Sequence, residues 1–160
     1  MDTLMNETEA TDNYVQMTRM IERLHRRHLD MLRYELDRLG VEGVSAAQVL
    51  MLTKIQDRAI TVRDLVERGY YLGSNASYNI KQLADFGLIE QERSPHDKRS
   101  VRVRLTKKGK ELCDNVAEAE ATHAKAMVDD VDGAAEIETA LRALRRLETT
   151  WSEYLRYDSF

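Results

Sequence analysis

Apolar residues recur at intervals of three or four positions over most of the chain, which is the spacing of one face of an α-helix. The first such run extends from Asp12 to Leu39 and predicts a helix of about seven turns. Two more runs end the chain: one starts after Thr106, and the other, from Ile137 to Tyr154, has a near-heptad stripe. Helices this long and this one-sided need a partner for their apolar faces.

Three shorter helical segments follow the first long run, and each has a signal that is typical of a helix start. Ser45 and Gln48 have the spacing of a capping box, and Thr61 and Asp64 repeat that spacing. The third segment, 74–86, begins after a glycine and ends before another. The pattern therefore predicts three short helices in succession.

Two stretches, 88–92 and 100–105, are the strand candidates of the sequence. The second alternates strictly between apolar residues and arginines, which places Arg102 and Arg104 on one face. The link between the two stretches, 93–99, is basic and rich in turn-forming residues. We expect a β-hairpin with a basic rim.

Three helices followed by a hairpin is the element order of a winged helix-turn-helix, whose third helix enters the major groove of DNA. We therefore predict a mainly α fold with a small β wing. The winged helix-turn-helix would occupy 41–109, and the helices of 12–40 and 110–160 would form a helical dimerisation region. Residues 1–11 are polar and without a period, and we expect them to be disordered.

The formal charge of the whole chain is −4, which taken alone argues against nucleic acid as a partner. Its distribution changes that view, because residues 58–110 hold twelve Lys or Arg against six Asp or Glu. Attraction to phosphate is local, since salt screens it beyond about 10 Å. A basic middle between acidic flanks is typical of a polyanion-binding module on a separate scaffold, although charge alone fits an ordinary solvated surface equally well.

The outward face of the third short helix carries short hydrogen-bonding side chains, which suit base edges in the major groove. A solvated helix face would normally be charged, and this face has a single cation, which suits a phosphate. We predict that the face contacts DNA. Its residues are Ser74, Asn75, Ser77, Tyr78, Asn79, Lys81 and Gln82.

The wing carries a more specific pattern than the order of elements. It resembles the D-x-R…L-T-x-x-G pattern of MarR-family transcriptional regulators, through Asp97-Lys98-Arg99 and Leu105-Thr106-Lys107-Lys108-Gly109. The resemblance extends over the whole chain and is most specific at the wing. The segment from Gly69 to Asn75 resembles an alphaproteobacterial subgroup of the family.

The resemblance implies a homodimer in which the first and last helices of both subunits intertwine. It also implies a wing arginine in the minor groove, here Arg99, and an acid that orients it, here Asp97. A narrow minor groove has an enhanced negative potential that attracts arginine. We expect His96, Lys98 and the two strand arginines to add attraction to phosphate. Without the hairpin context, Asp97 and Arg99 would be interpreted as an ordinary exposed ion pair.

A homodimer also follows from the apolar stripes of the long helices, because one copy exposes more apolar surface than its central lobe can cover. A twofold dimer predicts double-stranded DNA with a pseudo-palindromic operator, whose half-sites lie about one helical turn apart. The alternative is that these helices pack against each other within one chain.

The family resemblance further implies a repressor that a small-molecule effector modulates. His25 and His28 are the candidate ligand contacts, although a histidine on an apolar helix face is more often a core or interface residue, as is expected of His123. Glu22 completes a metal-like spacing with the first two, but no thiolate or further histidine supports it. We expect no metal and no other cofactor. Cys113, beside an apolar helix position, is interpreted as buried and inert.

Three wider predictions complete this interpretation. The sequence has no catalytic constellation, so we do not expect an enzyme. It has no signal-peptide pattern and no apolar run that is long enough for a bilayer, so we expect a cytoplasmic protein without a membrane partner. The rival to a DNA-binding regulator is a winged helix that docks a protein partner, with the basic wing as a solubilising rim.

Overall fold

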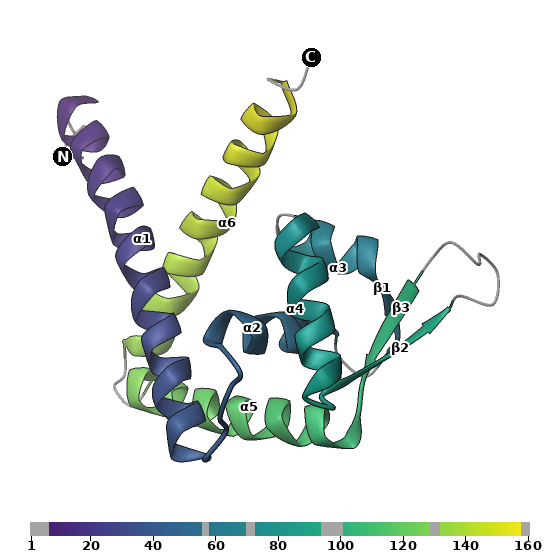
Figure 1. The fold of residues 1–160 in the computed structure, drawn as a ribbon. Coiled ribbons are helices and arrows are strands. Elements are labelled where there is room, and N and C mark those ends of the chain that lie inside the picture. Colours follow the sequence, from purple (N-terminus) through teal and green to yellow (C-terminus); the bar gives the residue numbers. More distant parts are fainter. Residues whose placement is uncertain (1–6, 56–57, 70–72, 94–100, 129–131, 158–160) are drawn as a thin grey trace. The chain divides into compact units, whose positions relative to one another are not determined.

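The computed structural model describes residues 7–55, 58–69, 73–93, 101–128 and 132–157 (Figure 1). This part of the chain is mainly helical with a small antiparallel sheet, which confirms the predicted fold class. Its elements are α1 (Glu7–Arg38), α2 (Ala46–Ile55), β1 (Ile60–Thr61), α3 (Val62–Gly69), α4 (Gly73–Asp85), β2 (Ile89–Arg93), β3 (Val101–Leu105), α5 (Lys107–Val128) and α6 (Gly133–Tyr157). The chain divides into two compact units, Met1–Val116 and Ala117–Phe160, and α5 runs from the first into the second.

The core of the first unit is built around α2. Val49, Met51 and Leu52 are fully buried, and α2 packs against α1, α3 and β3. A helix that is apolar on nearly all sides is stable only inside a core. The other elements of the unit complete this core with Leu32, Leu36, Ala46, Ile55, Ile60, Leu65, Ala76, Ile80, Leu83, Leu88, Ile89, Val103, Leu112 and Val116.

The sheet has three strands in the order β1-β3-β2, all antiparallel. β2 and β3 form the predicted hairpin, in register from Ile89 opposite Leu105 to Arg93 opposite Val101. The sequence analysis missed β1, which pairs Ile60 with Val103 on the other side of β3. A strand of two residues is too short to show a period, and only its pairing with β3 defines it.

Both predicted capping signals are confirmed at the starts of α2 and α3. The Ser45 N–H donates to Gln48 Oε1 at 2.9 Å, and the Gln48 N–H donates to Ser45 Oγ at 3.2 Å. At α3, the Asp64 N–H donates to Thr61 Oγ1 at 3.0 Å. These bonds satisfy backbone donors that the first turn of a helix leaves without partners, and they fix where each helix begins.

The first helix begins earlier than predicted. The sequence analysis assigned residues 7–11 to a disordered terminus, whereas α1 starts at Glu7. Two acids in its first turn, Glu7 and Glu9, interact favourably with the positive end of the helix dipole. The Thr11 hydroxyl also donates to the Glu7 carbonyl at 2.9 Å, so a polar segment without a hydrophobic period is still helical.

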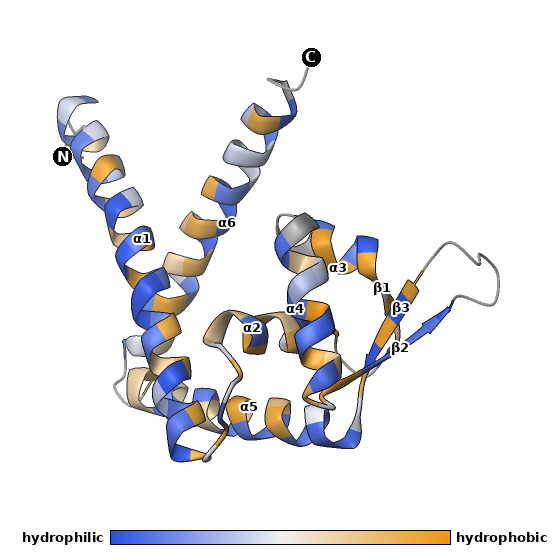
Figure 2. Cartoon of the chain, viewed as in Figure 1, coloured by the Kyte–Doolittle hydropathy of each residue, from blue (hydrophilic) through white to orange (hydrophobic). Residues whose placement is uncertain are grey.

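The long helices carry apolar stripes that remain exposed in one copy of the chain, as predicted. On α6 these residues include Leu141, Leu144 and Trp151, and on α1 they include Met20 and Leu24. Figure 2 shows apolar and polar residues alternating along both helices. The stripes are not continuous apolar runs, and no helix in the described part of the chain is long and apolar enough to cross a membrane.

The inward face predicted for α5 is confirmed only over its first half. Leu112, Val116 and Ala119 are buried, but His123 and Met127 are exposed. The helical period correctly placed all five residues on one face. Burial requires a packing partner as well as a period, and a period alone does not supply that partner.

Thr106 joins β3 to α5 and accounts for the L-T-x-x-G pattern. Its hydroxyl donates to the Gly87 carbonyl at 2.6 Å and accepts from the Gly109 N–H at 3.1 Å. Its own N–H donates to the Leu88 carbonyl at 3.1 Å. A Cβ atom on Gly109 would overlap that same Leu88 carbonyl oxygen, so a glycine is required where the first turn of α5 meets the start of β2.

We predict that Gly109→Ala destabilises the chain by about 3 kcal/mol, the upper part of the range for overpacking, because the added methyl group meets backbone rather than a movable side chain. Thermal unfolding monitored by circular dichroism measures the loss. Lys107→Ala, an exposed change in the same helical turn, is the control and should stay within about 0.5 kcal/mol of the parent. Equal melting temperatures for Gly109→Ala and the parent would contradict the close approach.

Candidate nucleic-acid interface

α4 is held against the core by one apolar face and presents the opposite face to solvent. Ala76, Ile80 and Leu83 are buried. Asn75, Ser77, Tyr78 and Lys81 are exposed. Tyr78, the aromatic residue of this helix, is 62% exposed. The structure thus brings four of the seven predicted contact residues of the helix together on one accessible surface. The side chain of a fifth, Ser74, lies outside the described residues.

Asn79 and Gln82 differ from the prediction, because both are half-buried and bonded within the protein. Gln48 of α2 donates through Nε2 to Gln82 Oε1 at 2.6 Å and to Asn79 Oδ1 at 3.2 Å. Gln82 Nε2 donates in turn to Tyr78 Oη at 2.8 Å. These two amides therefore connect α4 to α2, and their predicted contact with DNA stays a prediction.

Sequence reasoning missed Gln48 as a member of this site. It assigned the residue only to a capping box, yet Gln48 is 2% exposed and is one of the two buried polar side chains of the described chain. A signal was available, since Gln48 stands among apolar residues in the most apolar helix. A buried amide needs hydrogen-bond partners, and those partners are the residues of α4.

The wing arginines are also engaged within the protein rather than free on a rim. Arg102 is half-buried and donates to the Ala59 carbonyl at 2.9 Å. Arg104 donates from Nε and Nη2 to Glu90 Oε2, at 3.0 and 2.8 Å. The hydrogen bond and charge of Glu90 raise the pKa of Arg104, and the pair offsets one positive charge of the wing.

The tip of the wing, with His96, Asp97, Lys98 and Arg99, lies outside the described residues. The two strands beside it are described, and they end at Arg93 and begin again at Val101. The prediction that Asp97 orients Arg99 in a minor groove stays a prediction.

Comparison with known proteins gives this geometry a context. Residues 44–109 match the family described as "Winged helix DNA-binding domain". Over 160 residues the chain is 38% identical to the exopolysaccharide II synthesis transcriptional activator ExpG of Rhizobium meliloti (strain 1021), covering 98% of this chain and 82% of that protein. The chain belongs to the MarR family of winged-helix transcriptional regulators.

Solved structures share the MarR-family fold. FabT of Streptococcus pneumoniae, in complex with DNA, has a TM-score of 0.73 and 17% identity, covering 86% of this chain and 99% of FabT. A single-residue mutant of MarR from E. coli, complexed with operator DNA, has a TM-score of 0.66 and 23% identity, covering 89% and 99%. Wild-type MarR from E. coli in its apo form has a TM-score of 0.65 and 24% identity, covering 79% and 94%.

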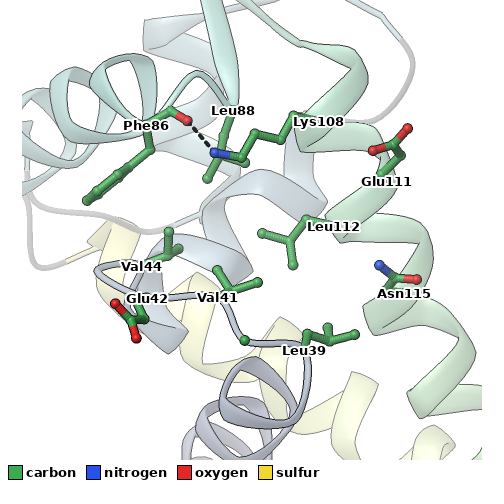
Figure 3. Close-up of a pocket in the computed structure, with 11 residues that line it drawn as sticks. Leu39, Val41, Glu42, Val44, Phe86, Leu88, Lys108, Glu111, Leu112 and Asn115 are labelled. Atoms are coloured by element: carbon green, nitrogen blue, oxygen red, sulfur yellow. Dashed lines mark hydrogen bonds between the residues drawn. The ribbon is translucent and has the colours of Figure 1, made fainter.

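The first unit of this MarR-family chain also contains a pocket of about 300 Å³ (Figure 3). Apolar side chains from the α1–α2 link, the α4–β2 link and the start of α5 form its wall, and Lys108 at its edge donates to the Phe86 carbonyl at 3.0 Å. Gly43, beside it, has a φ of +80°, and a Cβ there would meet the Phe86 ring at 3.0 Å. The lining comprises Leu39, Gly40, Val41, Glu42, Val44, Phe86, Leu88, Lys108, Glu111, Leu112 and Asn115.

The predicted ligand contacts are not part of this pocket. His25 and His28 are exposed on α1, and so is Glu22. The described residues contain no group of three His, Cys, Asp or Glu side chains that could hold a metal ion. The helical period placed both histidines near apolar positions, but both are exposed in the described part of the chain, so they are not core residues here.

Cys113 is half-buried beside the core, close to the buried position that was predicted. Burial, helped by the negative charge of the neighbouring Asp114, raises the pKa of its thiol to about 11, while the positive charge of Lys110 acts in the opposite direction. Because the thiolate is the reactive form, a high pKa makes this cysteine a poor nucleophile at neutral pH.

We predict that iodoacetamide labels Cys113 about a hundredfold more slowly in the native chain than in the urea-unfolded chain at pH 8, since an increase in pKa from 9.0 to about 11 removes that share of the thiolate. Mass spectrometry over time gives both rates. The native rate should continue to rise with pH above 9, where the rate of the unfolded chain levels off. Equal rates at pH 8 would show that the thiol is not desolvated.

Proposed function

We propose that this chain is a homodimeric, sequence-specific regulator of transcription that inserts α4 into the major groove of DNA and places the wing, 93–104, at the minor groove. The observation that carries the proposal is the exposed face of α4. It offers hydrogen-bonding groups on a rigid helix whose other face is fixed in the core, which is the arrangement that reading base edges requires. The match of residues 44–109 to a DNA-binding family supports it.

Attraction to the phosphate backbone would come from cations around this face. Lys81 on α4 and Arg93 at the end of β2 are exposed, and Lys98 and His96 lie between the strands in sequence. Arg102 and Arg104 add positive charge to the wing, but their bonds to Ala59 and Glu90 assign them mainly to holding the sheet together. The logarithm of the binding constant falls linearly with the logarithm of the salt concentration, and each phosphate that a cation neutralises makes this slope steeper by about one.

The rival function, a winged helix that docks a protein partner, is less well supported by this surface. A protein interface has a desolvated core that is depleted of charge and enriched in large apolar side chains. On the exposed face of α4 only Tyr78 is such a residue, and it is flanked by Asn75, Ser77 and Lys81. A titration of mixed genomic duplexes over a series of salt concentrations separates the two functions, because a protein-docking module would show no affinity for duplex even at low salt.

The direction of regulation and the effector complete the proposal. The family resemblance predicts a repressor, whereas the 38% identical relative is described as a transcriptional activator, and this relative favours activation. A reporter gene behind a bound promoter decides, since its expression falls on deletion of an activator and rises on deletion of a repressor. We propose that a small effector binds the first unit, that the operator is pseudo-palindromic, and that the protein acts in the cytoplasm, where bacterial DNA lies.

We predict that Arg99→Ala weakens binding to the operator by about tenfold, because one charge in an electronegative minor groove is lost. The dimer should stay intact. Fluorescence anisotropy gives the affinity, and analytical ultracentrifugation gives the mass of the complex. Arg19→Ala, an exposed change on α1, removes the same charge far from the wing in sequence and should leave the affinity unchanged. If both variants bind equally well, Arg99 has no part in recognition.

We predict that the chain sediments as a dimer and that Leu144→Lys shifts it toward the monomer. Leu144 is 42% exposed in one copy and belongs to the apolar stripe of α6, so a charge there would be buried without a partner in a helical interface. Thr149→Lys adds the same charge to an exposed position away from the stripe and is the matched control. A parent chain that sediments as a monomer at micromolar concentration would contradict the homodimer.

A further inference from the structure

We propose that Gln48, although it does not reach the surface, makes Tyr78 an obligate hydrogen-bond donor toward DNA. The inference deepens the proposed function and rests on it. It follows from a chain of hydrogen bonds in which the direction of each bond is set by the bond before it. The chain starts at the backbone of Ser45, passes through Gln48 and Gln82, and ends at the exposed hydroxyl of Tyr78.

The first bond sets the orientation of the Gln48 amide. The backbone N–H of Ser45 can only donate, so the atom of Gln48 that lies 2.9 Å from it must be the oxygen. The Gln48 NH2 group then faces α4. An amide nitrogen has no free lone pair to accept with, and the orientation is locked because Gln48 is buried among core side chains.

The second step transfers this orientation to α4. The Gln48 NH2 group lies 2.6 Å from Gln82 and 3.2 Å from Asn79, and both must present their oxygens to it. Reversing the Gln82 amide would place two NH2 groups against each other, which leaves a half-buried donor without an acceptor. The NH2 group of Gln82 therefore points away from α2, toward Tyr78.

The third step sets the role of the Tyr78 hydroxyl. Gln82 Nε2 donates to Tyr78 Oη at 2.8 Å. This bond occupies the in-plane lone pair of the phenolic oxygen, whose other lone pair is delocalised into the ring, so the hydroxyl proton points elsewhere. Among the described residues no side chain or carbonyl accepts that proton, and the tyrosine is 62% exposed. The hydroxyl consequently presents a proton to whatever binds the face of α4.

The group that Tyr78 contacts on DNA is therefore an acceptor. In the major groove the acceptors are guanine O6 and N7, adenine N7 and thymine O4, whereas the exocyclic amino groups of cytosine and adenine are donors. A phosphate oxygen is an acceptor of the same kind. A base acceptor would make Tyr78 discriminate at one position of the operator, and a phosphate acceptor would make it strengthen binding to every sequence.

The experiment reverses the direction of this series of hydrogen bonds where it begins, at Gln48. Gln48→Glu keeps an oxygen for the Ser45 N–H but replaces the NH2 group with a second oxygen, so Gln82 must turn its NH2 group inward. The Gln82 oxygen then faces Tyr78, and the Tyr78 hydroxyl must donate its proton to that oxygen. At a pH above the pKa of the new carboxyl group, the affinity for a duplex selected from a random library should fall about fivefold to tenfold, the equivalent of one hydrogen bond. Fluorescence anisotropy measures this affinity.

Three further variants complete the test. Tyr78→Phe removes the proton directly and should cause the same loss. The double variant should bind no more weakly than either single variant, because both remove one and the same bond.

Gln91→Glu, which adds a negative charge at an exposed position of β2, controls for charge. It should not change the ratio of affinities for selected and random duplexes, whereas Gln48→Glu changes that ratio if the acceptor is a base. With a phosphate acceptor, Gln48→Glu and Tyr78→Phe weaken both duplexes equally and more than Gln91→Glu does.

Several outcomes would overturn the inference. One is that Gln48→Glu binds both duplexes as Gln91→Glu does, and another is that the losses in the double variant add. If Tyr78→Phe binds the selected duplex as tightly as the wild type does, the inference is wrong. This result does not need the Gln48 variant, so the test stays decisive even if Gln48→Glu unfolds in a thermal melt. A wild-type chain that binds no duplex defeats the proposed function as well, whereas a wild type that binds while its variants retain full affinity defeats the inference alone.

Discussion

The burial of α2 is the constraint on which the rest of the first unit depends. Its apolar side chains contact α1, α3 and β3 at once, so the long helix, a short helix and the sheet are positioned against one element. An apolar helix in the middle of a small unit leaves little room for polar groups, because each one needs a partner inside the core. Gln48 is the buried polar residue of this helix, and its partners lie on the helix that is proposed to read DNA.

The periodic and local features of this fold could be predicted from the sequence. The helices that follow the capping boxes at Ser45 and Thr61 begin where expected, because a cap is a contact between residues three apart and the sequence contains both of them. The hairpin was predicted from the alternation in β3. The surplus apolar surface of α6 was predicted from its stripe. In each case the information lies within a few turns of helix or one strand.

Features that depend on distant partners could not be predicted in this way. β1 exists because Ile60 meets Val103 more than forty residues later. Arg102 is predicted to add attraction to phosphate, and the pattern gives no sign that its guanidinium is bonded to the carbonyl of Ala59. His123 and Met127 lie on the predicted face of α5, but both are exposed in the described chain. Sequence pattern assigns a residue to a face, and only tertiary packing shows what that face meets.

The ion pair of Arg104 with Glu90 also changes how the charge of residues 58–110 should be understood. A count of residues gives 58–110 a surplus of cations, but Arg104 is bonded to Glu90 at an exposed position, and an exposed pair contributes little to stability. Its effect on the field is larger than its effect on the fold, because each pair removes a charge from the attraction that phosphates would feel. The positive charge available to DNA is thus concentrated on fewer groups than the count suggests. For the proposed recognition of DNA, this favours hydrogen bonds of defined direction on α4, such as the one proposed for Tyr78, over net charge.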